Sequence, residues 1–152
     1  MSRCRESAAL LTAALEPADV RVDERLGAKT SGHLGGRRRD LAATEAARQG
    51  VPSHQLCIPG GEPSEYVRAR YVRLWDEARA GPHPTTVLIG HGEGMACLLL
   101  RLTGNGFDCY LEHVPGSAGV TWIEVDEEAP RIRLMNVPAA DLAGHLTART
   151  AR

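Results

Sequence analysis

The sequence predicts an α/β protein: an open, mostly parallel sheet flanked by helices, with an antiparallel hairpin near the C-terminus. The first observation is the continuous apolar run TTVLIG at residues 85–90, typical of a strand buried on both faces. The second is a pair of alternating segments at residues 119–126 and 130–137, separated by an acidic turn, which indicates a hairpin. At 152 residues, 43% of them hydrophobic, the chain is expected to form a single domain over residues 1–152.

The elements before the apolar run are mainly helical. Apolar residues at helical spacing predict a helix over residues 3–15, which Pro17 ends. A weak alternation predicts a short strand over residues 20–26. The Gly-, Arg- and Pro-rich stretch at residues 27–63 contains a short predicted helix closed by Gly50, and a long stretch of this kind tends to carry function on a rigid scaffold.

The clearest helix covers residues 64–80. Its apolar residues share one face and are expected in the core: Val67, Tyr71, Leu74, Trp75 and Ala78. A second, buried helix follows the apolar run and ends at Gly104. The tail at residues 140–152 is expected to be a modest helix or a frayed end.

Composition excludes several function classes. The net charge of −1 gives no basic surface for nucleic acid or for an anionic membrane. No apolar run is long enough to span a bilayer and the N-terminus lacks a signal-peptide pattern, so we expect a cytoplasmic protein. The four cysteines are widely spaced without a C-x-x-C pair, so neither a metal site nor a disulfide framework is expected, and no cofactor is predicted.

The turn GHGEG at residues 90–94 is the main candidate for chemistry. Ligands of open α/β sheets bind at the carboxyl ends of strands, where His91 is expected. The helix that follows offers unpaired N–H groups and a dipole that favour an anion, and a histidine there can hold an anionic oxygen or move a proton. Glu93 is the nearest candidate general acid or base, or simply a favourable charge at the helix start. A plain turn with a solvent-facing His91 remains the alternative.

Four segments in order resemble motifs of the histidine phosphatase superfamily, the phosphoglycerate-mutase-like fold. Residues 85–104 resemble its second histidine motif, and residues 2–15 resemble its Arg-x-x-x-Thr-Ala helix, with Arg3 in place of the phosphate-pocket arginine. Residues 22–36 and 59–78 resemble the two segments that lie between these motifs in the family. The resemblance implies an anion pocket, for a phosphorylated or sulfated small molecule, with these binding candidates: Arg3, Arg5, His33, His91 and Gly92.

The departures from the family pattern are equally informative. The Arg-His-Gly motif, which carries the family's phosphorylated histidine, does not occur, and Ala28 and Gly35 stand where the family places a proton-donating glutamate. We therefore expect a core that lacks the family's first strand, helix and second strand. Arg5 either joins the pocket or is solvated, and His33 either replaces the lost acid or lies on a surface loop.

The missing strand would lie beside residues 85–90 in the family. We therefore expect either a homo- or hetero-oligomer in which another chain covers their exposed edge, or a rearranged sheet. Three functions stay open: a divergent protein that keeps an anion pocket and works with a partner or on a phosphorylated or sulfated molecule; an ordinary phosphatase or mutase with an incomplete chain; and a non-catalytic interaction subunit. Whether the chain is an enzyme is left undecided.

Overall fold

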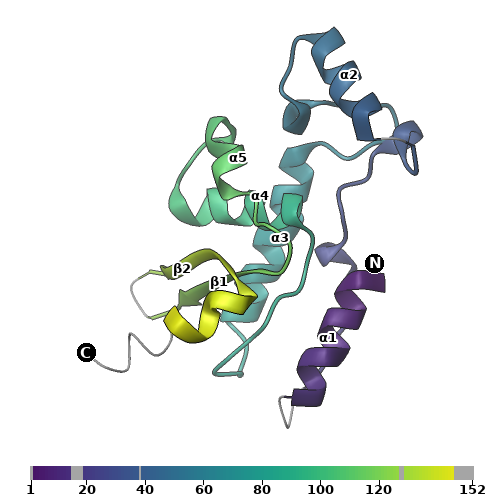
Figure 1. Ribbon diagram of the computed structural model, residues 1–152. Coiled ribbons are helices and arrows are strands. Elements are labelled where there is room, and N and C mark those ends of the chain that lie inside the picture. Colours follow the sequence, from purple (N-terminus) through teal and green to yellow (C-terminus); the bar gives the residue numbers. More distant parts are fainter. Residues whose placement is uncertain (1, 15–18, 38, 127–128, 146–152) are drawn as a thin grey trace.

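The computed structural model describes residues 2–14, 19–37, 39–126 and 129–145 (Figure 1). Among these residues the α-helices are α1 (Ser2–Ala14), α2 (Arg39–Gln49), α3 (Ser64–Arg79), α4 (Gly92–Thr103) and α5 (Tyr110–His113). Short 3-10 turns are η1 (Glu24–Leu26), η2 (Gly32–Leu34), η3 (Ser53–Gln55), η4 (Phe107–Cys109) and η5 (Ala139–Asp141). The strands are β1 (Gly119–Glu124) and β2 (Arg131–Pro138).

The main core lies between α3 and α4. The amphipathic pattern of α3 buries Val67, Tyr71 and Leu74, as predicted, while α4 is apolar over most of its length. The cluster also includes Tyr110 of α5. Gly104 ends α4 with φ at 76°, a left-handed conformation in which glycine carries no steric penalty. This packing fixes the start of α4, and with it the GHGEG turn.

A smaller core holds α2. Ala46 of α2 is buried with Leu56 and Ile58 of the segment that follows η3. The predicted helix closed by Gly50 is confirmed, because α2 ends at Gln49 and Gly50 has φ at 67°. The Gly- and Pro-rich region therefore has a packed centre of its own.

The predicted hairpin is confirmed. Strands β1 and β2 pair antiparallel from Gly119 opposite Pro138 to Glu124 opposite Arg131. The register is irregular on either side of Trp122, and Asn136 in the opposite strand adopts a positive φ of 55°. Such a bulge increases the local twist of a hairpin. This is the one sheet formed by the part of the chain that the structure describes.

Two expected strands are wrong in detail. Residues 85–90, expected as a buried strand of a parallel sheet, are extended but not assigned as a strand, and Val87 is 59% exposed. An extended segment becomes a strand only when a neighbour pairs with its backbone, and none of the described residues does so. Residues 20–26 form no strand either, because the Asp23 side chain accepts a hydrogen bond from the Arg25 N–H and starts η1.

The first helix differs from the others in its burial. The predicted helix is confirmed over Ser2–Ala14, whereas the expected end at residues 15–17 lies outside the described residues. Helix α1 has no buried residue, and Leu10 is 76% exposed. Figure 1 shows α1 at one side of the molecule, beside the chain that leads into η1. In the tail, helical turns reach residue 145 and the remainder lies outside the described residues.

Candidate functional site

His91 is the N-cap residue of α4. Its backbone is extended, with φ at −96° and ψ at 147°, and the next residues enter the helix. The ring atom Nε2 is buried and has no hydrogen-bond partner among the described residues. Burial lowers the pKa of His91, and the positive charges of Arg3 and Arg70 lower it further. The imidazole is therefore a neutral, unpartnered group beside the free N–H groups of a helix start.

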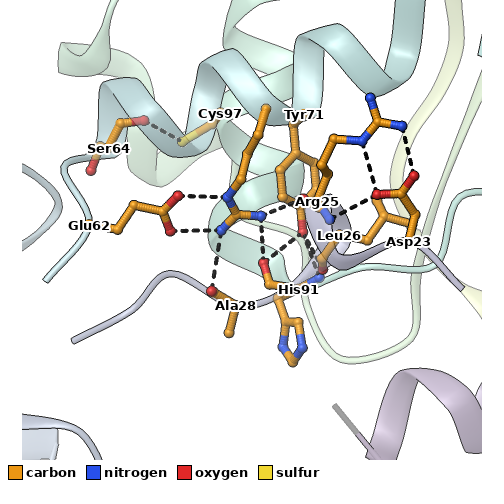
Figure 2. Close-up of polar contacts among 11 residues, drawn as sticks. Asp23, Arg25, Leu26, Ala28, Glu62, Ser64, Tyr71, His91 and Cys97 are labelled. Carbon is orange, nitrogen blue, oxygen red and sulfur yellow. Dashed lines mark hydrogen bonds and ion pairs between the residues drawn. The ribbon is translucent and has the colours of Figure 1, made fainter. Parts of the chain in front are cut away.

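Tyr71 of α3 holds His91 in place. Its hydroxyl donates a hydrogen bond to the Leu26 carbonyl at 2.8 Å and accepts one from the His91 N–H at 3.3 Å (Figure 2). The ring lies against the GHGEG turn so closely that a Cβ at Gly94 would be 2.0 Å from Tyr71 Cζ. Gly94, the third glycine of the turn, is thus required by packing. Figure 2 shows the His91 imidazole pointing away from the hydrogen bonds that fix its backbone.

Arg70, the residue before Tyr71, contacts residues 25, 27 and 28, on either side of the Leu26 carbonyl that Tyr71 contacts. Its guanidinium forms a bidentate pair with Glu62, at 2.7 and 2.9 Å. It also donates to the carbonyls of Gly27 at 2.9 Å and Ala28 at 3.2 Å, and to that of Arg25. Arg70 lowers the pKa of Glu62, so this carboxylate stays charged. One side chain therefore determines the path of residues 25–28 below α3.

A second ion pair attaches η1 to α3. Arg25 donates to both carboxylate oxygens of Asp23 and to both of Glu77. Hydrogen bonding from Arg25 lowers the pKa of Asp23 to about 2. Glu77 belongs to the last turns of α3, so this network attaches η1 to a part of α3 that Arg70 does not reach.

The predicted site residues fall into three places: the start of α4, α1 and η2. Gly92 and Glu93 follow His91 in the first turn of α4, and the Gly92 backbone lies near Pro115. Both candidate arginines, Arg3 and Arg5, are exposed on α1, and Arg3 is close enough to act electrostatically on His91.

His33 lies elsewhere. It is exposed on η2, with its Nδ1 at 3.4 Å from the Pro59 carbonyl oxygen, in the part of the chain around the smaller core. These contacts fit the surface-loop alternative more simply than a proton donor beside His91.

A small cavity lies next to the first turn of α4. It has a volume of about 60 Å³, and its lining includes Lys29, Glu62 and Glu93. A larger, open hollow of about 500 Å³ between α3 and the end of α4 is lined by Arg68 and Arg101 and by none of the predicted site residues. Sequence reasoning treated Tyr71 only as core and missed Arg70 and Lys29 as parts of the site. The one available signal was that Lys29 is the only lysine in the chain.

Neither a membrane-spanning helix nor a metal site is found in the part of the chain that the structure describes. No helix among them is long and apolar enough to cross a membrane. No group of three or more His, Cys, Asp or Glu residues in these ranges gathers in a way that could hold a metal ion.

Comparisons with known proteins agree on the fold. The family profile described as histidine phosphatase superfamily (branch 1) matches residues 1–138. A mycobacterial glucosyl-3-phosphoglycerate phosphatase, solved with inorganic phosphate, superimposes with a TM-score of 0.73 at 24% identity, over 90% of this chain and 73% of that one. A structure described as mycobacterial hydrolase 1 gives a TM-score of 0.72 at 23% identity, over the same shares.

One curated protein shows sequence similarity. A 2-epi-valiolone synthase of Stigmatella aurantiaca (strain DW4/3-1) is 32% identical over 87 residues, which are 57% of this chain. The match spans 20% of the length of that protein. It therefore relates one part of this chain to one part of a much longer protein.

Proposed function

The chain belongs to the histidine phosphatase superfamily (branch 1), and from this premise we propose that it binds a phosphate or sulfate group at His91 without carrying the family's phosphorylated histidine. The observation that supports the proposal is the buried Nε2 atom of His91, which has no partner among the described residues. Burying a polar nitrogen without a hydrogen bond costs free energy, and an oxyanion would supply that bond.

The surroundings of His91 favour an anion. The first N–H groups of α4 have no partner within the helix, and the helix dipole places partial positive charge at the same point. Arg3 adds a full positive charge within electrostatic reach. An anion bound here would favour the protonated imidazole, whose Nε2–H would then donate to an anionic oxygen.

The chemistry proposed for this pocket is limited. Two-step phosphoryl transfer in the family requires an imidazole nucleophile from the Arg-His-Gly motif, and the printed sequence contains no such triplet. His91 would stabilise charge on the bound group and does not replace that nucleophile. Groups that act as a unit lose nearly all their catalysis when one is removed. The ligand is accordingly a phosphorylated or sulfated small molecule that this chain binds alone or together with a partner.

Residues 85–90 support a partner. They form no strand in the described structure; residues 85–87 are exposed, Val87 at 59%, and residues 88–90 are half-buried. An unpaired extended segment readily accepts another strand. We propose that a second polypeptide segment, in a homo- or hetero-oligomer, pairs with it and completes the site next to His91. A non-catalytic interaction subunit and an ordinary phosphatase or mutase with further chain are the alternatives to this function.

A thermal-shift titration tests the anion site. Sulfate and inorganic phosphate are expected to raise the melting temperature of the wild type, and the double variant His91→Ala, Arg3→Ala is expected to abolish the shift. Arg73→Ala is the matched control, because Arg73 is an exposed arginine on α3 that pairs with Glu77 at 3.5 Å. An equal melting shift in the double variant and the wild type would overturn the anion site.

Sedimentation of the purified chain, alone and with co-expressed products of neighbouring genes, tests the partner. An assembly that Val87→Glu dissociates is the expected result, because a charge would enter the paired segment. A stable monomer that neither self-associates nor recruits a second chain would contradict this part of the proposal.

A further inference from the structure

His54 connects the two cores of the molecule through a stack of rings. It belongs to η3, directly before the residues that form the smaller core with α2, and it is only 9% exposed. Its ring stacks on that of Tyr110 in α5, with centroids 4.7 Å apart, and lies 6.1 Å from that of Phe107 in η4. Tyr110 belongs to the main core and Phe107 packs against it. His54 is therefore a point at which α2 and its core are attached to the rest of the molecule.

We propose that His54 is a pH-sensitive latch: its neutral imidazole holds the α2 lobe on η4 and α5, and protonation releases the lobe. The α2 lobe is defined as residues 39–58, which comprise α2, η3 and the short segment after η3. The principal neighbour of α2 among the other elements is η3, and Figure 1 shows α2 apart from α3, α4 and α5. Few contacts besides the stack therefore hold the lobe in place. The latch does not depend on the proposed anion site.

The His54 ring has no acceptor for an additional proton. Its Nε2 atom is buried and has no hydrogen-bond partner among the described residues. The His54 carbonyl accepts hydrogen bonds from the Lys29 ammonium, at 3.2 Å, and from Ser64 Oγ, and these hold the backbone beside the stack. A protonated ring would add a second positive charge near Lys29. Burial first, and then Lys29, lower the pKa of His54, while a backbone hydrogen bond with Phe107 acts in the opposite direction.

The other ionisable groups around the stack do not compensate the charge of a protonated ring. They come from α3, α4, α5 and the chain after η1: Glu65, Arg68, Glu93, Tyr110 and Lys29. Glu65 is already paired with Arg68 at 2.6 Å, and burial raises the pKa of Tyr110, so its hydroxyl is neutral. Among the described residues, Lys29 is the charged side chain that acts on His54. Protonation therefore weakens the stack without forming a new ion pair.

Release of the α2 lobe changes the surroundings of the start of α4. Ala42, Leu56 and Ile58 of the lobe line the small cavity of about 60 Å³, and Glu93 of α4 lines it as well. Once the His54 ring leaves the stack, the apolar wall is free to move away from Glu93 and the cavity opens to solvent. The latch thus couples pH to solvent access beside α4.

Hydrogen exchange followed by mass spectrometry tests the latch on the full chain, with protection factors that remove the intrinsic pH dependence of exchange. In the released lobe His54 is exposed, with an ordinary pKa of about 6.5. The released state therefore binds the proton more readily, and its population rises by at most about tenfold for each pH unit below that value. Peptides from residues 42–58 are expected to lose protection several-fold between pH 7.5 and 5.5, while peptides from α4 keep theirs.

Four variants assign the effect to His54. His54→Phe keeps an uncharged ring in the stack and is expected to make lobe protection independent of pH, whereas His54→Ala is expected to lower it at both pH values. His83→Phe is the matched control, because His83 is an exposed histidine in the segment after α3, and it is expected to behave as the wild type. His91→Asn is expected to leave the pH-dependent loss in the lobe unchanged, which separates the latch from the proposed anion site.

Several outcomes would overturn the latch. Equal lobe protection of the wild type at both pH values is one, and an equal loss in the lobe and in α4 is another, because it indicates global unfolding. A loss in His54→Phe as large as in the wild type is a third. If that variant does not fold, the Cε1–H resonance of His54 in the wild type decides: a titration midpoint below 6.5 that coincides with the loss of lobe protection supports the latch, and a midpoint at or above 6.5 contradicts it.

Discussion

The two sides of the candidate site differ in how firmly they are built. On the α3 side, Arg70 and Tyr71 hold residues 25–28 and the His91 backbone with hydrogen bonds, and Tyr71 is 1% exposed. On the other side, α1 has no buried residue, and of residues 85–90 the first three are exposed and the rest half-buried. Both sides contribute to the proposed anion site, because His91 lies between them and Arg3 belongs to α1.

This difference shows which part of the site is preorganised. The orientation of His91 is fixed by the packing of α3 against α4, whereas the cation that would join it comes from a helix with little packing. A ligand or partner that bridges the two sides would stabilise the second side much more than the first. Substitutions on the α3 side should therefore affect stability, and those on the α1 side should affect binding.

The largest effect is expected from a substitution on the α3 side of the site, where packing and hydrogen bonds hold His91. Tyr71→Ala removes a buried aromatic ring and the hydroxyl that holds His91, and is expected to lower the free energy of unfolding by about 3–5 kcal/mol. Leu10→Ala on α1, where the side chain is 76% exposed, is expected to change it by less than about 0.5 kcal/mol. Urea unfolding followed by circular dichroism measures both. Similar losses for the two variants would show that α1 is packed as firmly as α3.

A smaller difference in the free energy of unfolding is expected between variants of two arginines of α3, Arg70 and Arg73. Arg70→Met leaves the half-buried Glu62 carboxylate and three carbonyls without their donor, and is expected to cost about 1–3 kcal/mol of unfolding free energy. Arg73→Met breaks only an exposed pair with Glu77, so about 0–0.5 kcal/mol is expected. The same urea titration compares them. An Arg70 variant as stable as the Arg73 variant would remove the proposed role of Arg70 in fixing residues 25–28.

Local patterns predicted much of this architecture. Four helices and the hairpin follow from apolar spacing and from glycines at helix ends, such as Gly50 and Gly104. The position of His91 at the start of α4 also follows from the order of the apolar run, the glycines and the next helix. These features depend on neighbouring residues, which is the information that a single sequence carries.

Long-range features were out of reach for the same reason. The contacts of Arg70 with residues 25–28 span more than 40 positions of the chain, so no local pattern shows them. The requirement for Gly94 comes from Tyr71, a residue of another helix. Residues 85–90 have the composition of a buried strand, yet burial depends on a neighbour that the described residues do not supply.

The smallest expected effect is on the pH dependence of stability and comes from the charge of His91, the residue between the two sides of the site. Burial first, and then Arg3 and Arg70, lower its pKa below the ordinary value of 6.5. The unfolded chain therefore binds the proton more readily than the folded chain, so this residue makes stability fall as the pH is lowered through about 6.5 towards the folded-state pKa. His91→Asn should remove that component, and denaturant unfolding at several pH values measures the difference between variant and wild type.

Adding sulfate makes the pH experiment specific to His91, because sulfate itself stays doubly charged across this pH range. A sulfate ion at the pocket should raise the pKa of His91, and its affinity should increase as the pH falls. The Cε1–H resonance of His91, followed by NMR with and without sulfate, reports the pKa directly. Arg3→Ala should raise the pKa in the absence of sulfate and reduce the shift that sulfate causes. A His91 pKa that sulfate leaves unchanged would show that α1 and the start of α4 do not form one anion site.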